Sequence, residues 1–111
     1  MSETDFGYVG RENLPLFADL YELTMMQGYY RQGHNPTATF DLFFRHLPPD
    51  RGYLLAAGLE QAIHVVEHLS FADRAIDYLA EQGFAADFLA HLADLEFTGE
   101  VRAVPEGTPV F

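Results

Sequence analysis

The sequence predicts an α+β fold in which helices pack on a small, mainly antiparallel sheet. Apolar residues recur at helical spacing in four segments, and three short segments have the alternation or the β-prone composition of strands. The chain has 111 residues, 49% of them hydrophobic, which is enough for one domain with a modest core. We therefore expect an extended N-terminal arm over residues 1–13 and one domain over residues 14–111.

The first helix is expected from about Pro15 to Gly33, with Asn13 as its N-cap and Gly33 as its C-terminal stop. One apolar face repeats at spacings of three and four residues: Leu16, Leu20, Leu23, Met26 and Tyr30. A second apolar stripe lies beside it: Phe17, Tyr21 and Met25. The helix should therefore pack against two surfaces.

A strand is expected from Ala38 to Arg45, where Phe40, Leu42 and Phe44 alternate with the other face. The two prolines that follow would stop a strand from continuing, because proline cannot donate to the ladder. Arg45 would then lie where the chain leaves the sheet, a place where functional sites often form.

Three further helices are expected after this strand. Tyr53 to Leu69 is the most clearly amphipathic segment of the chain. Ser70 then suits the N-cap of a third helix that ends at Gly83, with Asp73 in a capping-box-like position. The apolar residues of the third and fourth helices are Ile76 and Leu79, and Phe84, Phe88, Leu92 and Leu95.

The last part of the sequence predicts a β-hairpin. Strands over residues 100–104 and 108–111 would flank Pro105-Glu106-Gly107, which suits a type I turn with a bulge. The sequence stops inside the second of these strands, so we expect the domain to be a fragment of a longer polypeptide.

The composition excludes several classes of function. The formal net charge of −11 argues against nucleic acid or an anionic membrane as a partner. No apolar stretch is long enough to span a bilayer, and Met-Ser-Glu-Thr-Asp lacks the basic and apolar regions of a signal peptide, so a cytoplasmic location is expected. The absence of cysteine rules out disulfides and thiolate metal sites.

The six basic residues are all arginines, and two of them, Arg45 and Arg51, flank one short loop. Guanidinium groups match phosphate oxygens in geometry, so this pair is a candidate anion site. The alternative is that both are solvated loop arginines.

His64, Glu67 and His68 spell H-x-x-E-H, a zinc-peptidase pattern. On a helix the two histidines are one turn apart and could share a metal. The pattern is short and lies opposite the apolar stripe, without a third ligand, so we interpret it as a solvated face and predict no metal site.

Asp19 and Tyr21 are an acid and a phenol two residues apart near a helix start. Residues at this spacing do not face the same way on a helix. Asp19 could favour the helix N-terminus electrostatically and Tyr21 could be a core residue, so the spacing alone leaves a structural role open.

Three longer runs carry a family resemblance. They are Phe17 through Gly33, Ala38 through Arg45 with Gly52 through Leu59, and Phe97 through Gly107. In this order, from about Leu14 to Phe111, the sequence resembles the N-terminal domain of the nicotinate phosphoribosyltransferases, a type II phosphoribosyltransferase family. Several ordered matches are more specific than any single short motif.

The resemblance implies roles for four residues. The family's Asp-x-Tyr corresponds to Asp19 and Tyr21, and the tyrosine is expected to pack on the pyridine ring of the substrate. Arg45 is expected at phosphate groups, and Arg51 is a further substrate-binding candidate. The site would be shared with a neighbouring subunit of a homodimer.

The resemblance also implies a reaction. Nicotinate would attack phosphoribosyl pyrophosphate to form nicotinate mononucleotide for NAD biosynthesis, with Mg²⁺ at the pyrophosphate and ATP hydrolysis coupled through a histidine that is not among the five here. The family's α/β barrel, which holds most of the site, is absent from this chain, so the isolated chain should be inactive. The alternative is a non-catalytic binding or assembly module derived from the family.

Overall fold

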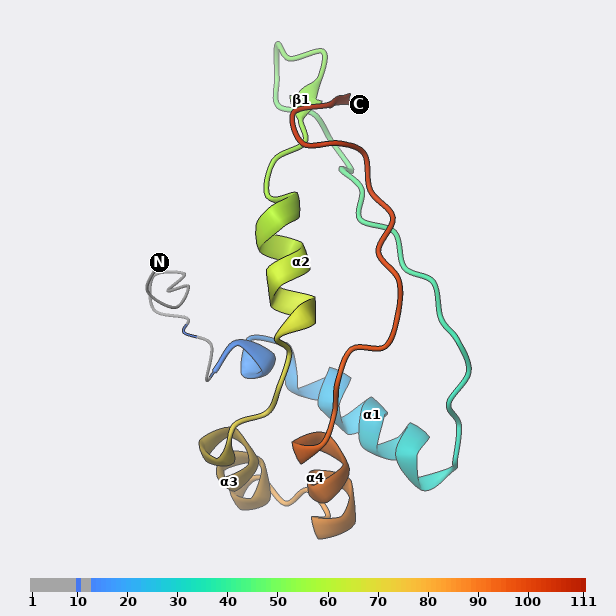
Figure 1. The fold of residues 1–111 in the computed structure, drawn as a ribbon, viewed down its shortest axis with the longest axis vertical. Coiled ribbons are helices and arrows are strands. Elements are labelled where there is room, and N and C mark those ends of the chain that lie inside the picture. Colours follow the sequence, from blue (N-terminus) through green and yellow to red (C-terminus); the bar gives the residue numbers. More distant parts are fainter. Residues whose placement is uncertain (1–9, 11–12) are drawn as a thin grey trace. The chain divides into compact units, whose positions relative to one another are not determined.

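The computed structural model describes Gly10 and residues 13–111, and the chain falls into two compact units. The first unit comprises the described residues up to Pro36 together with residues 69–96, and the second comprises residues 37–68 and 97–111. Within the described residues, four α-helices and a two-stranded antiparallel sheet confirm the α+β class (Figure 1). The predicted arm lies almost entirely outside the described residues.

The first unit is helical and holds the hydrophobic core. Its elements are a 3₁₀ turn η1 (Leu14–Leu16) and the helices α1 (Leu20–Arg31), α3 (Asp73–Glu81) and α4 (Ala86–Ala93). Helix α4 packs against both α1 and α3. The buried residues are Leu23, Phe71, Ala75, Leu79, Phe88, Leu89 and Leu92. The apolar spacing read from the sequence therefore identified the helices that enclose the core.

Helix α1 starts later than predicted. It begins at Leu20 with Asp19 as its N-cap, whereas Asn13 precedes only the 3₁₀ turn. The Asp19 N–H donates to the Glu22 carboxylate at 3.1 Å, so an acid three residues into the helix satisfies a donor at its start. The prediction of Gly33 as the stop is confirmed, since it follows the helix with a φ of +62° that favours glycine.

Of the two predicted apolar faces, only the first reaches the core, and only in part, since Leu20 is 55% exposed. Leu23 is buried, and Leu16 and Met26 pack against the buried cluster. The second stripe is exposed: 77% at Phe17, 61% at Tyr21 and 47% at Met25. The expected second packing surface for these side chains does not form within the first unit.

The start of α4 is capped by a residue of α1. Ala85 occupies the N-cap position, but an alanine side chain cannot accept a hydrogen bond from the helix. The Ala85 N–H instead donates to the Gln27 side-chain oxygen at 2.8 Å. This contact joins residues 58 positions apart and fixes α1 against the N-terminus of α4.

Helix α3 also differs from the prediction at its start. It begins at Asp73 with Ala72 in the N-cap position, so the prediction of Ser70 as the cap is wrong. Phe71 lies between them and is buried in the core, which draws the chain inward before the helix begins. The end of α3 at Gly83 is confirmed by a φ of +94°.

Replacing Gln27 with alanine should destabilise the first unit by about 1 kcal/mol, because the Ala85 donor loses its partner. Thermal unfolding followed by circular dichroism measures this. Gln32→Ala, at the exposed C-cap position of the same helix, is the matched control and should change stability by less than about 0.5 kcal/mol. Equal effects of the two substitutions would contradict the role of Gln27 as a cap.

The second unit consists of β1 (Leu54–Leu55), α2 (Leu59–Glu67) and β2 (Pro109–Val110). The two strands are antiparallel, with Leu54 opposite Val110 and Leu55 opposite Pro109. The ladder continues beyond them, because the Ala56 N–H donates to the Thr108 carbonyl at 2.8 Å and the Gly107 N–H donates to the Ala56 carbonyl at 2.7 Å. No described side chain of this unit is among the buried ones.

Two strand predictions for this unit are wrong. The hairpin of residues 100–104 with 108–111 does not form, because β2 pairs with β1 instead. The turn within it does form, with the Thr108 N–H donating to the Pro105 carbonyl and Gly107 at a φ of +82°. Residues 38–45 are irregular and exposed, because no strand pairs with them within the described residues.

The predicted helix of residues 53–69 is shorter than expected. Leu54 and Leu55 are extended in β1, and α2 begins only at Leu59. Gly58 has a φ of +110°, which lies outside the helical region and separates strand from helix. Among the described residues, no helix is long and apolar enough to cross a membrane.

Candidate functional site

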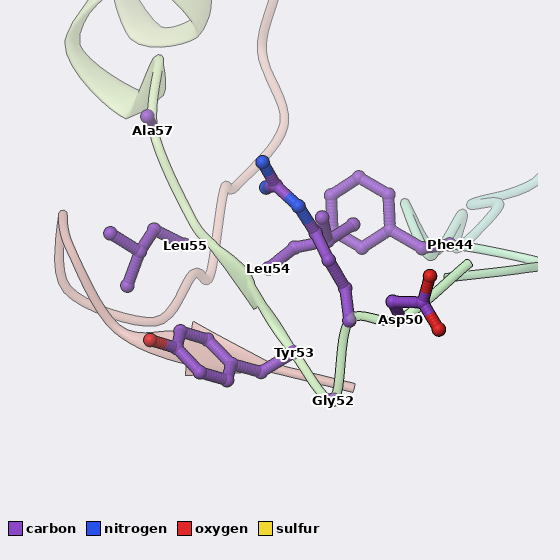
Figure 2. Close-up of a pocket in the computed structure, with 8 residues that line it drawn as sticks. Phe44, Asp50, Gly52, Tyr53, Leu54, Leu55 and Ala57 are labelled. Carbon is purple, nitrogen blue, oxygen red and sulfur yellow. The ribbon is translucent and has the colours of Figure 1, made fainter. Parts of the chain in front are cut away.

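An open pocket of about 740 Å³ lies within the second unit (Figure 2). It is formed by the end of the irregular segment, the following turn and strand β1. Its lining residues are Phe44, Asp50, Arg51, Gly52, Tyr53, Leu54, Leu55 and Ala57. The pocket thus combines two aromatic rings, aliphatic side chains, one guanidinium and one carboxylate.

The polar end of the pocket is built by a tight turn. The Arg51 N–H donates to the Pro48 carbonyl at 3.2 Å, which closes the turn. Asp50 has a φ of +64°, and aspartate is one of the few residues other than glycine that tolerates this conformation. Because of this turn, the consecutive residues Asp50 and Arg51 both line the pocket.

The apolar part of the pocket follows from the extended backbone. Figure 2 shows the Tyr53 and Leu55 side chains on one side of the chain, and the Leu54 side chain on the side of the Phe44 ring. This is the alternation that a strand imposes on successive residues. A ligand with a flat apolar part and an anionic group would match the aromatic rings and the Arg51 guanidinium.

The two arginines predicted as an anion site differ in position. Arg51 lines the pocket, whereas Arg45 lies at an exposed bend directly after Phe44 and is not among the lining residues. The pocket therefore contains one of the two guanidinium groups.

Asp19 and Tyr21 belong to the first unit. Asp19 is the exposed N-cap of α1, and Tyr21 lies in the first turn with 61% of its surface exposed. The Tyr21 ring is therefore not a core residue, and it is accessible for contact with another molecule. Its joint action with Arg45, in the second unit, stays a prediction.

The H-x-x-E-H pattern lies at the C-terminal end of α2, with His68 at the C-cap position. The rings of His64 and His68 stack with centroids 4.2 Å apart, and the His68 Nδ1 lies 2.9 Å from the His64 carbonyl oxygen, to which it donates. Within Gly10 and residues 13–111, no group of three or more His, Asp or Glu side chains could hold a metal ion. The pair therefore forms a local contact at the end of the helix.

Comparison with known proteins identifies the family. Residues 16–111 match the model of the nicotinate phosphoribosyltransferase (NAPRTase) N-terminal domain. The chain belongs to this family. The matched range spans both units and contains all four predicted site residues.

Among curated relatives, the chain is 46% identical over 97 residues to nicotinate phosphoribosyltransferase pncB2 of Mycobacterium tuberculosis, covering 86% of this chain and 21% of the relative. It is 42% identical over 102 residues to the nicotinate phosphoribosyltransferase of Bacillus subtilis, covering 90% and 21%. It is 37% identical over 102 residues to the nicotinate phosphoribosyltransferase of the mouse, covering 87% of this chain and 19% of the relative. The chain thus spans about a fifth of these relatives. No solved structure matches it.

Several notable residues of this nicotinate phosphoribosyltransferase domain were not identified from the sequence as site or capping residues. Asp50 and Tyr53 line the pocket, and the sequence signal that could have indicated them is the turn-forming Pro-Asp-Arg-Gly stretch beside an aromatic residue. Gln27 and Glu106 each cap a helix that is distant in sequence. No local pattern indicates such a contact.

Proposed function

We propose that this chain acts as the N-terminal domain of a nicotinate phosphoribosyltransferase, which joins nicotinate to phosphoribosyl pyrophosphate to form nicotinate mononucleotide with ATP hydrolysis. The observation that carries the proposal is the family match over residues 16–111. The names and the identity of the curated relatives support it.

In this proposal Tyr21 receives the pyridine ring of nicotinate. Its exposed ring offers a flat apolar face, and stacking between aromatic rings contributes about 0.5–1.5 kcal/mol beyond area burial. Asp19, as N-cap, fixes the start of the helix that carries this ring. A substrate ring between Tyr21 and groups from the rest of the enzyme would be held in a fixed orientation.

Arg51 and Arg45 serve the phosphoribosyl substrate. Arg51 lines an open pocket beside aromatic rings, where a guanidinium can donate two parallel hydrogen bonds to a phosphate. Arg45 is exposed one residue beyond Phe44 and adds positive charge nearby in sequence. In a chain of net charge −11, these guanidinium groups offset the repulsion of an anionic substrate.

The chemistry is a displacement at the anomeric carbon. The ring nitrogen of nicotinate forms the new bond as the bond to pyrophosphate breaks, through a transition state of oxocarbenium character. This chain's residues orient the ring and neutralise phosphate charge, and proton transfer is not assigned to any of them. Mg²⁺ and ATP belong to the proposed reaction, but no described cluster of this chain suits a metal, so we assign no ligand here.

The proposal includes a second copy of the chain: the accessible Tyr21 ring would lie in a site that a neighbouring subunit completes in a homodimer.

A second candidate function is a binding or assembly module without chemistry. The exposed segment of residues 38–45 favours it. Phe40 is 90% exposed and Leu42 is 98% exposed, and apolar patches of this kind commonly mark a contact with another molecule.

The 111-residue chain alone should form no nicotinate mononucleotide from nicotinate, phosphoribosyl pyrophosphate and ATP, because it supplies only part of a site. The same chain joined to the remaining four fifths of the Bacillus subtilis relative should turn over. Chromatographic detection of the mononucleotide measures both.

The control is the same chimera with nicotinamide in place of nicotinate, after size-exclusion chromatography has established that the chimera is folded and dimeric. A folded chimera without turnover would count against the enzyme proposal and favour the assembly module. Turnover by the isolated chain would show that the site is complete in it.

A further inference from the structure

Glu106 makes a long-range contact within the second unit. Its Oε2 accepts hydrogen bonds from the N–H groups of Gly58 and Leu59, both at 3.1 Å. Glu106 lies in the turn before β2, and the two donors lie at the N-terminus of α2, 47 and 48 residues earlier. One carboxylate oxygen thus joins the two chain segments of the unit.

The contact has a clear physical basis. The first N–H groups of a helix have no partner within the helix, and Gly58 at the N-cap position has no side chain to accept from them. A carboxylate is a strong acceptor, and its negative charge is favoured at the positive end of the helix dipole. Glu106 therefore supplies from a distance the cap that the local sequence lacks.

The cap is the last of several hydrogen bonds that hold the backbone of the pocket wall. From Leu54 to Leu59 the backbone is held by the β1–β2 pairing, then by the hydrogen bonds of Ala56 with Gly107 and Thr108, and finally by Glu106. Three residues of this stretch line the pocket: Leu54, Leu55 and Ala57. Because no described side chain here is buried, these hydrogen bonds carry much of the local order.

We propose that Glu106 is a positioning residue for the pocket, which it shapes by capping α2 and thereby fixing the strand that forms the pocket wall. The effect on substrate binding rests on the proposed function, whereas the cap itself does not. The two parts are therefore tested separately.

The cap is tested in the 111-residue chain by amide hydrogen exchange. Glu106→Ala should accelerate exchange at Gly58 and Leu59 by about tenfold, close to the loss of one helix cap. Glu106→Gln keeps an acceptor of the same length and should restore much of the protection. Glu100→Ala is the matched control, because Glu100 is in the same unit and pairs only with its neighbour Arg102 among the described residues.

Exchange at Gly58 and Leu59 that is no faster in Glu106→Ala than in Glu100→Ala would overturn the proposal. If Glu106→Ala removes protection along the whole of α2, the glutamine variant decides. Recovery in that variant supports a capping role, and no recovery refutes it. Amides of the helical unit should stay protected throughout.

The effect on binding is tested in the active chimera. Glu106→Ala should raise KM for phosphoribosyl pyrophosphate about tenfold and change kcat less than about twofold, with KM recovering in Glu106→Gln. A fall in kcat at constant KM would refute positioning of the pocket. An inactive parent chimera would refute the proposed function and leave the exchange result to decide the cap.

Discussion

Replacing Phe88 with alanine is expected to unfold the helical unit. Phe88 is 1% exposed and is the largest fully buried side chain among the described residues. It contacts the rings of Tyr30 on α1 and Phe84 before α4, each at a centroid distance of 5.9 Å. Removal of a buried phenylalanine ring costs about 3–5 kcal/mol, a large part of the stability of a small domain.

Chemical denaturation followed by circular dichroism measures this loss. The matched control is Phe40→Ala, the same substitution at a side chain that is 90% exposed, which should shift stability by less than about 0.5 kcal/mol. If the two variants unfold at the same denaturant concentration, Phe88 is not the centre of the core.

Replacing Tyr21 with alanine in the active chimera is expected to lower kcat/KM for nicotinate by about 10- to 100-fold. The estimate corresponds to the 1–3 kcal/mol that one stacked aromatic contact with a heterocyclic base contributes. The side chain is 61% exposed, so its removal leaves no cavity and the fold should be retained. The loss would then report a contact with substrate.

Two further variants sharpen this test. Tyr21→Phe keeps the ring and should retain activity within about threefold, which separates stacking from the hydroxyl. Tyr29→Ala removes a similarly exposed ring from the same helix and should have little effect on kcat/KM. Equal losses at positions 21 and 29 would refute a specific role for Tyr21.

The helices of the first unit could be predicted because their information is local. Apolar residues at spacings of three and four identified the faces that carry Leu23, Leu79 and Phe88, and glycines after α1 and α3 indicated the ends. The starts were less accurate. Asn13 and Ser70 are good capping residues by type, but the chain uses Asp19 and Ala72.

The strands could not be predicted because the partner of each strand can lie far away in the sequence. The turn at Pro105 to Gly107 was identified from its residues, yet β2 pairs with a segment more than fifty residues earlier rather than with its neighbour. Alternation in residues 38–45 indicates a strand only if another strand accepts its hydrogen bonds. The sequence pattern carries no information on that partner.

In the candidate site, too, some residues could be predicted from the sequence and others could not. Tyr21 could be singled out from the family resemblance, and Arg51 because it flanks one short loop together with Arg45; Tyr21 is exposed and Arg51 lines the pocket. Phe44, Asp50 and Tyr53 join Arg51 only through the turn and strand that form the pocket. Their proximity depends on backbone geometry that residue types alone do not reveal.

The distant caps impose an order on folding during synthesis. Gln27 is synthesised before α4, so the acceptor for the Ala85 N–H is already present when Ala85 leaves the ribosome. Gly58 and Leu59 at the start of α2 are made 48 and 47 residues before Glu106, so their N–H groups can bind only water until that glutamate has left the ribosome. The helical unit can therefore fold early, whereas the pocket wall gains all of its hydrogen bonds only after residues 106–110 have been translated.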